Sequence, residues 1–197
     1  MHISGLRSFA ALVCGLSASQ PNNNVSKSVC ESMILPVLQY PDPRLARVSE
    51  EVKEITPALR ELVDNMVETM YARDGIGLAA PQVGEAIRLV VIDVSGPSNR
   101  EDLRVLVNPR LTLSGDEVDS EEGCLSVKDF QASVIRRERA RVEATDLDGN
   151  PVVFDADGTL AICAQHECDH LEGTLFIDHI SRLKRSMYDR KVQKKTG

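Results

Sequence analysis

Two histidines and a glutamate in the last third of the chain have the spacing of a hydrolytic metal site. Residues 165–170 contain the pattern H-E-x-x-H. On an α-helix of about 3.6 residues per turn, His166 and His170 lie one turn apart on the same face, so both imidazoles can bind one metal ion. Glu167 lies beside them and can handle the proton of a water molecule at that ion. The pattern therefore predicts metal-assisted hydrolysis, provided that another side chain completes the site.

The residues after the motif supply few candidates for a third ligand. In one class of zinc peptidase the pattern continues to a further histidine, but Phe176 occupies that position here. Another class uses a downstream glutamate, and no glutamate follows Glu172. His179 and Asp178 remain open as ligands, although they match neither pattern.

Two cysteines share the expected helix with the histidines. Cys168 is two residues from His166, about 200° around the helix axis, and so should face away from the metal. Cys163 shares the face of the histidines but lies roughly 10.5 Å along the axis from His170. Metal bonds of about 2.0–2.3 Å cannot close that gap, so we interpret Cys163 as part of a pocket wall.

The remaining cysteines lie far from the motif. The chain has five, an odd number without a CxxC pair, which favours a reducing compartment over a disulfide framework. Cys14 and Cys30 belong to an N-terminal segment of unusual composition. Cys124, preceded by the permissive Gly123, is the strongest candidate for the third ligand; the alternative is a buried structural thiol.

The elements that must position these residues follow from periodicity and from helix and turn signals. Proline lacks the N–H that a strand needs, so a strand at 105–107 should end at Asn108-Pro109. The sum is an α+β fold, mostly antiparallel β-sheets wrapped around a central metal-binding helix, with a C-terminal helix. The expected elements are a helix from Thr56 towards Gly75, strands at 89–92 and 105–107, a hairpin of 141–145 with 152–154, the motif helix over 160–171 stopped by Gly173, and a last helix over about 181–195.

Length and charge limit the number of domains and the classes of protein to which the chain can belong. Its 197 residues suit one domain, which we expect over 33–197. Residues 1–32 differ in composition and are expected to be an unstructured extension, a targeting segment, or the result of a start placed upstream of Met33. No apolar run approaches the length of a membrane span, and the net charge of −7 argues against a DNA-binding surface.

The C-terminal segment has the opposite charge from the rest of the chain. From residue 180 onward there are seven basic residues and one acid, Asp189. Such a segment is either a solvated helix face or a surface that docks onto a polyanion.

Three motifs together resemble the peptide deformylase family. They occur in the family's order and extend the likeness over about residues 34–191. The segments at 40–45 and 107–109 are also similar to the family. The motifs are G-I-G-L-A-A-P-Q-V-G at 75–84, E-G-C-L-S at 122–126, and Q-H-E-C-D-H-L-E-G at 165–173.

The resemblance implies a reaction and a set of roles. The formyl group of N-formylmethionine on newly synthesised proteins would be hydrolysed to formate, with metal-bound water attacking the formyl carbonyl. The metal ligands would be Cys124, His166 and His170. Glu167 would be the general acid and base, Gln82 and the Leu125 backbone N–H would receive the oxyanion, and Ile76 and Gly77 would hold the substrate backbone.

The resemblance also implies a cofactor and a setting. One thiolate and two imidazoles suit several divalent metals; the family implies Fe²⁺, with Zn²⁺, Ni²⁺ or Co²⁺ as substitutes. The partners would be nascent N-formylmethionyl peptides, with neither DNA nor membrane. The basic C-terminal helix, through its charge, motivates a further hypothesis, docking on ribosomal RNA. Bacterial cytoplasm is the expected compartment, and a mitochondrion or plastid is second. Lys128 and Gln131 depart from residues common in the family, which leaves the preference beyond formylmethionine open.

Two other functions compete with this interpretation. A metal-dependent peptidase built on the same H-E-x-x-H helix would cleave internal peptide bonds and would not need Cys124. A ribosome-binding relative with a decayed site would need no catalytic residues, and the presence of Gln82, Cys124 and Glu167 argues against it.

Overall fold

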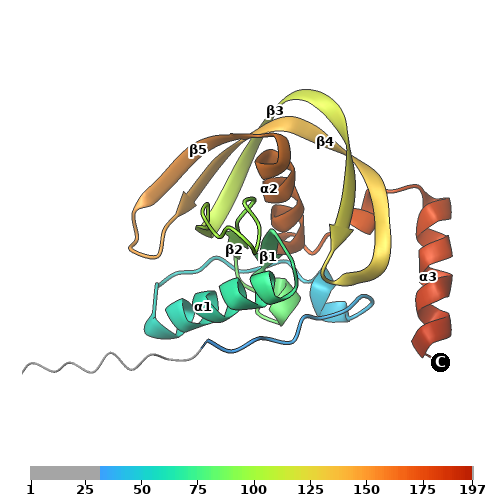
Figure 1. Cartoon of the computed structure of the whole chain (residues 1–197), viewed down its shortest axis with the longest axis horizontal. Helices are drawn as coiled ribbons and strands as arrows, with labels where there is room; N and C mark the ends of the chain where they lie inside the picture. The colour runs from blue at the N-terminus through green and yellow to red at the C-terminus, as the bar shows by residue number, and fades with distance from the viewer. Residues whose placement is uncertain (1–31, 197) are drawn as a thin grey trace, which may run out of the picture. The chain divides into compact units, whose positions relative to one another are not determined.

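One antiparallel sheet, with its strands in the order β1-β2-β3-β4-β5, frames the protein (Figure 1). In the computed structural model, residues 32–196 are described, and the side chains of residues 195 and 196 are not. The predicted extension over residues 1–32, with Cys14 and Cys30, lies outside the described residues apart from its last position. The strands are β1 (Gly77–Ala79), β2 (Leu89–Ile92), β3 (Arg104–Cys124), β4 (Val127–Thr145) and β5 (Pro151–Asp157).

Within the described part of the chain, three α-helices and three short 3-10 helices complete the fold. The central one, α2, contacts all five strands, and the long strands β3 and β4 bend around it (Figure 1). The predicted α+β class is thereby confirmed, including the antiparallel sheet and the C-terminal helix. The helices are α1 (Pro57–Ala72), α2 (Gly158–Leu171) and α3 (Arg182–Thr196), and the 3-10 helices are η1 (Pro43–Ala46), η2 (Ala80–Val83) and η3 (Phe176–Asp178).

Helix α1 begins as its capping residues predict. The Thr56 side chain accepts a hydrogen bond of 3.2 Å from the Leu59 backbone N–H, and Pro57 occupies the first turn, where its missing N–H costs nothing. Val63, Met66 and Met70 are buried against the sheet, so the methionines belong to the core. The helix ends at Ala72, three residues before Gly75.

The prediction that the strand ends at Asn108-Pro109 is wrong, because β3 continues to Cys124. The pair forms a bulge instead: the β3–β4 register shifts between Val107 and Arg110, and Asn108 has a φ of 53°. The partner strand β2 begins opposite Val107. Beyond that point β3 pairs only with β4 within residues 32–196, so the N–H that proline lacks is not needed on the other edge.

Helix α2 runs slightly longer than the sequence indicates. It begins at Gly158 and ends at Leu171, with Gly173 in the left-handed region at a φ of 71°. A Cβ on Gly173 would stand 2.6 Å from the Ala46 carbonyl oxygen, so only glycine fits. Small side chains at Ala161 and Ala164 bring α2 close to the sheet. Among the described residues, none of the helices has the length and apolar character needed to cross a lipid bilayer.

Candidate metal centre

The end of β3 and the middle of α2 bring one sulfur and two ring nitrogens together. Donor atoms of Cys124, His166 and His170 all lie within 4.8 Å of one another. The Cys124 Sγ is 3.2 Å from the His170 Nε2. Both imidazoles are buried, as expected for side chains on the inner face of α2. The structure thus assembles the three side chains that sequence analysis singled out as ligands.

These donors fit a divalent transition metal. Bonds of about 2.0–2.3 Å around a tetrahedral ion separate neighbouring donors by about 3.6 Å, close to the spacing found here. Burial, together with the positive charge of the nearby Arg136, holds the pKa of His170 well below its usual value. The neutral imidazole is the form that binds metals. The carboxylate of Glu167 lies next to these donors. Among the described residues, its buried Oε2 has no hydrogen-bond partner, as expected where a cation and water complete the site.

A carboxylate that sequence analysis missed orients one of the two histidines. The Glu122 Oε2 lies 2.8 Å from the His166 Nδ1, which leaves the other ring nitrogen for the metal. Glu122 itself receives two hydrogen bonds from the Arg136 guanidinium, at 2.7 and 3.0 Å. Burial acts to raise the pKa of Glu122, but the hydrogen bonds from His166 and Arg136 outweigh it and lower that pKa to about 2. Glu122 is therefore ionised at neutral pH.

The strand pattern contained a signal for Glu122. Side chains two residues apart in a strand share a face, so Glu122 had to lie on the same side as Cys124. Arg136 carried no comparable signal, because its partners come from a different strand and from α2. Its guanidinium also donates to the Asp169 carboxylate at 2.6 Å.

Replacing Glu122 by glutamine should weaken metal binding without removing a ligand. The amide cannot stabilise the imidazole as strongly as a carboxylate, and such losses typically lower metal affinity about 10- to 100-fold. The measurement is the chelator concentration that removes half of the metal. The neighbouring Glu121→Gln is a matched control, because Glu121 is exposed on the other face of the strand. Equal chelator concentrations for the two variants would contradict a supporting role for Glu122.

Glu167 lies next to the metal donors and packs closely against Gly77. Its carboxylate is buried, and burial raises its pKa to about 7, so it can both accept and donate a proton near neutral pH. A Cβ on Gly77 would stand 2.4 Å from the Glu167 Oε1 and 2.8 Å from the Cys163 Sγ. Gly77 therefore leaves room for the carboxylate to face the metal centre.

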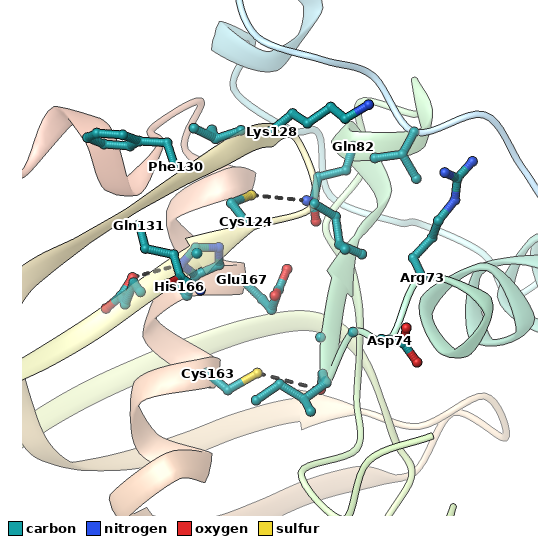
Figure 2. Close-up of a pocket in the computed structure, with 18 of the residues that line it drawn as sticks. Arg73, Asp74, Gln82, Cys124, Lys128, Phe130, Gln131, Cys163, His166 and Glu167 are labelled. Atoms are coloured by element: carbon teal, nitrogen blue, oxygen red, sulfur yellow. Dashed lines mark hydrogen bonds and ion pairs between the residues drawn. The ribbon is translucent and has the colours of Figure 1, made fainter. Parts of the chain in front are cut away.

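The amide of Gln82 is aimed at the same centre by its neighbours. Its Oε1 accepts a 2.8 Å hydrogen bond from the Ala79 backbone N–H, which leaves the Nε2 as the donor on the other side. This Nε2 lies 3.5 Å from the Cys124 Sγ (Figure 2). It also lies 3.2 Å from the Ser126 hydroxyl. Ser126 is a second polar residue of the site that sequence analysis did not single out. The geometry provides a fixed N–H donor next to the metal donors.

The centre opens into a cavity of about 1100 Å³. Figure 2 shows Glu167 and Cys163 facing this space from α2, with Gln82 on the opposite side. Cys163 lies 3.6 Å from the Ile76 carbonyl oxygen and forms part of the wall, as predicted. Other lining residues that sequence analysis named include Gly77, Leu125, Lys128 and Gln131.

The remaining candidate ligands lie away from the three donors. Cys168 lines a different, smaller cavity of about 380 Å³, in agreement with its predicted outward direction. The His179 Nε2 lies 2.8 Å from the Asp169 carboxylate, and Asp178 pairs with Arg185. Neither His179 nor Asp178, both left open by the sequence, joins the three donors.

Comparisons with known proteins agree with this geometry. The family model described as polypeptide deformylase matches residues 34–186. A peptide deformylase from Legionella pneumophila is 42% identical, with a TM-score of 0.78, and the alignment covers 83% of this chain and 95% of that one. One from Ehrlichia chaffeensis, in complex with actinonin, is 40% identical with a TM-score of 0.76, covering 83% and 98%. Arabidopsis thaliana peptide deformylase 1B, in complex with an inhibitor, is 35% identical with a TM-score of 0.75, covering 83% and 94%.

These likenesses span the whole site, from the loop before β1 to the end of α2. They confirm the enzyme class expected from the three motifs, a metal-dependent deformylase, over the non-enzymatic alternative. The match from residue 34 to residue 186 covers most of the chain. We conclude that the chain belongs to the polypeptide deformylase family.

Proposed function

We propose that this protein hydrolyses the N-formyl group of nascent N-formylmethionyl peptides, giving formate and a free amine. The observation that carries the proposal is the convergence of Cys124, His166 and His170 within 4.8 Å, beside a buried carboxylate and at the base of an open cavity. A peptidase using the same helix would not call for a sulfur ligand from β3.

In this proposal Cys124, His166 and His170 hold one divalent metal ion. When bound, such an ion acidifies water and polarises a carbonyl group. Glu167 takes a proton from the attacking water and delivers it to the departing nitrogen, without which the amine cannot leave. Its burial and its pKa of about 7 support both halves of this transfer. The Gln82 Nε2 and the Leu125 backbone N–H donate hydrogen bonds to the oxygen on which negative charge develops.

The peptide is held as an additional strand. Among the residues that the structure describes, β1 pairs only with β2, on one side. An unpaired strand edge can accept an extended peptide. Ile76 and Gly77 lie at the start of this edge and line the cavity. Their backbone groups are proposed to bind the peptide backbone, which brings the formyl group towards Glu167.

Formate release tests the proposal. The metal-loaded protein, prepared without oxygen, should release formate from formyl-Met-Ala and leave the internal peptide bond intact. Acetyl-Met-Ala serves as a matched substrate that cannot give formate. Cleavage between methionine and alanine without release of formate would favour the alternative function, a metal-dependent peptidase. The absence of any product would reject both activities.

Removing the Gln82 donor should slow the reaction strongly. Gln82→Leu keeps a similar volume but places no N–H near the developing charge, and the loss of one such donor costs about 10²–10³ in kcat. Ser126 would lose a hydrogen-bond partner but stays in place. The check is kcat for formyl-Met-Ala at equal metal content. A loss of less than about threefold would remove Gln82 from the proposed oxyanion site.

The metal is proposed to be Fe²⁺, with Zn²⁺, Ni²⁺ or Co²⁺ as substitutes. One thiolate and two imidazoles accept all four ions, so the donor set supports the group of metals and the family likeness favours iron. Metal analysis of protein purified without oxygen is the direct measurement. Reconstitution with each ion separately then compares their activities.

The outer face of α3 is proposed to dock onto ribosomal RNA. Lys184 and Arg190 are exposed on this face, and Leu183 and Met187 are 72% and 63% exposed. Basic side chains that contact phosphates release counterions, which would make binding depend steeply on salt.

Reversing charge on α3 should separate docking from catalysis. In the double variant Lys184→Glu with Arg190→Glu, affinity for ribosomes in co-sedimentation should fall at least about tenfold at low salt, while formate release from formyl-Met-Ala is retained. Arg47→Glu with Lys53→Glu reverses two exposed charges elsewhere and should bind like the unaltered protein. Equal sedimentation of both double variants would reject docking through α3.

We also propose that residues 33–197 form one catalytic domain and that residues 1–32 are an extension. The first part is supported by the structure of Ser32–Gly197, which form one compact unit. A reducing compartment, bacterial cytoplasm first and a mitochondrion or plastid second, is consistent with the free thiols of Cys124, Cys163 and Cys168. Fusion of residues 1–32 to a fluorescent protein would test a targeting role.

A further inference from the structure

One wall of the substrate cavity is formed by the five residues 127–131, here called the wall segment. It follows the turn after Cys124 and opens strand β4. Within it, Asp129 has a φ of 57°, a conformation that is unfavourable for a residue with a Cβ. Such a backbone needs support from the surrounding structure.

Helix α3 supplies that support through three contacts. The Tyr188 hydroxyl donates to the Lys128 carbonyl oxygen at 3.3 Å. The Lys191 Nζ donates to the Asp129 carbonyl oxygen at 3.0 Å. The rings of Tyr188 and Phe130 stack at 4.5 Å between centroids. The helix therefore holds the wall segment by its backbone as well as by an aromatic side chain.

The contacts leave the Lys128 side chain free. Its side chain is exposed and lines the cavity, and among the described residues its ammonium group has no hydrogen-bond or ion-pair partner. Figure 2 shows it extended above Gln82, with Arg73 and the acidic Asp74 lower down on the same side of the view. An exposed cation whose backbone is held at the cavity can pair with an acidic group of a bound peptide.

The cavity has room for more than the first residue of a peptide. Its volume of about 1100 Å³ is slightly larger than the pockets that hold whole drug-sized ligands, about 300–1,000 Å³. One methionine side chain fills only a small part of it. Residues after methionine therefore pass between the walls of the cavity, where Lys128 is one of the lining residues. An acidic side chain there would meet the ammonium group, and a basic one would be repelled.

We propose that α3, through Tyr188 and Lys191, positions Lys128 so that the enzyme prefers N-formylmethionyl peptides with an acidic side chain at one of the two residues after methionine. The inference rests on the proposed deformylase function and specifies its substrate class. It gives α3 a role inside the catalytic domain in addition to its outer basic face. Lys128 acts here as a specificity-determining residue, and Tyr188 and Lys191 are positioning residues.

Four formylated tripeptide amides test the preference, with glutamate or lysine at the second or the third residue and alanine at the other. The amides remove the terminal carboxylate, so only the side chain differs in charge. At low salt, kcat/KM should favour glutamate by about two- to fivefold at one of the positions, the range of an exposed ion pair. Salt of about 1 M should bring the ratio close to one. Lys128→Glu should reverse the preference, and Lys128→Met should abolish it.

The positioning role of Tyr188 and Lys191 is tested by the ratio of kcat/KM for the glutamate peptide to that for the lysine peptide. Tyr188→Phe with Lys191→Met removes both hydrogen bonds to the wall segment but keeps the stacked ring, and should lower the glutamate-to-lysine ratio to that of Lys128→Met. Lys53→Met is the matched control, since it removes an exposed lysine that does not line the cavity, and its ratio should equal that of the unaltered protein.

Each result has a distinct meaning. Equal kcat/KM for all four peptides, with formate released from each, overturns the preference while leaving the deformylase function intact. A ratio unchanged by the α3 double variant overturns the positioning role, because loss of general stability would change rates without changing the ratio. Failure to release formate from any peptide, including formyl-Met-Ala, rejects the proposed function itself.

Discussion

Replacing Glu167 by glutamine should lower kcat for formyl-Met-Ala by at least about 10³-fold while the metal stays bound. Proton transfer by a positioned side chain contributes about 10²–10⁴ in rate, and glutamine fills the same space without being able to take or give a proton. Glu167 is not among the three converging donors, so metal content should match that of the unaltered protein. Single-turnover formate release and metal analysis on the same sample are the two measurements.

A second glutamate at the end of α2 is a suitable control for this substitution. Glu172 is exposed and pairs with Arg88, away from the cavity, so Glu172→Gln should leave kcat within about twofold. If Glu167→Gln retained more than about a tenth of the activity at equal metal content, another group would have to move the proton. Loss of metal in the same variant would instead indicate a structural role for the carboxylate.

The substitution Cys124→Ser should remove metal and activity together. A serine hydroxyl stays protonated at neutral pH, whereas the thiolate is the form that binds metal, so two imidazoles alone would have to hold the ion. We expect metal to be lost on dialysis against a weak chelator and formate release to fall at least about 10³-fold, since catalysis depends on the ion. Metal analysis before and after dialysis measures the first effect.

Another cysteine separates this effect from a general loss of a thiol. Cys168 lies on α2 but lines the other cavity, and burial raises its pKa to about 12, so it carries no thiolate at neutral pH. Cys168→Ser should retain both metal and activity. A Cys124→Ser variant that keeps its metal and still hydrolyses peptide bonds would favour the alternative peptidase.

Local patterns in the sequence were sufficient for the parts of the site that lie on one element. The spacing of His166 and His170 depends only on the pitch of a helix, and the structure brings both rings together as that spacing predicts. The cap at Thr56 and the stop at Gly173 are also local, because each is a property of a few consecutive backbone groups. For Cys124, the exclusion of the other cysteines and the family resemblance were both needed.

Contacts between distant elements could not be read in the same way. Asn108-Pro109 forms a bulge because β2 begins opposite Val107, a fact of register that proline chemistry alone does not contain. Arg136 meets Glu122 and Asp169 only because β3, β4 and α2 pack together. The alternation of side chains between the two faces of β3 was a usable signal for Glu122. No local pattern indicated that Arg136 would be its ion-pair partner.

The sequence by itself determined the chemistry of this protein: two imidazoles and a carboxylate at fixed helical spacing, a distant thiol, and three ordered motifs. Those properties follow from residue type and from the regular geometry of single elements. Only the tertiary structure decided how the site is supported, from the hydrogen bond of Glu122 to His166 to the contacts of α3 with the wall segment. The physical reason is that such contacts join residues far apart in the chain, and their geometry exists only after the sheet has curved around α2.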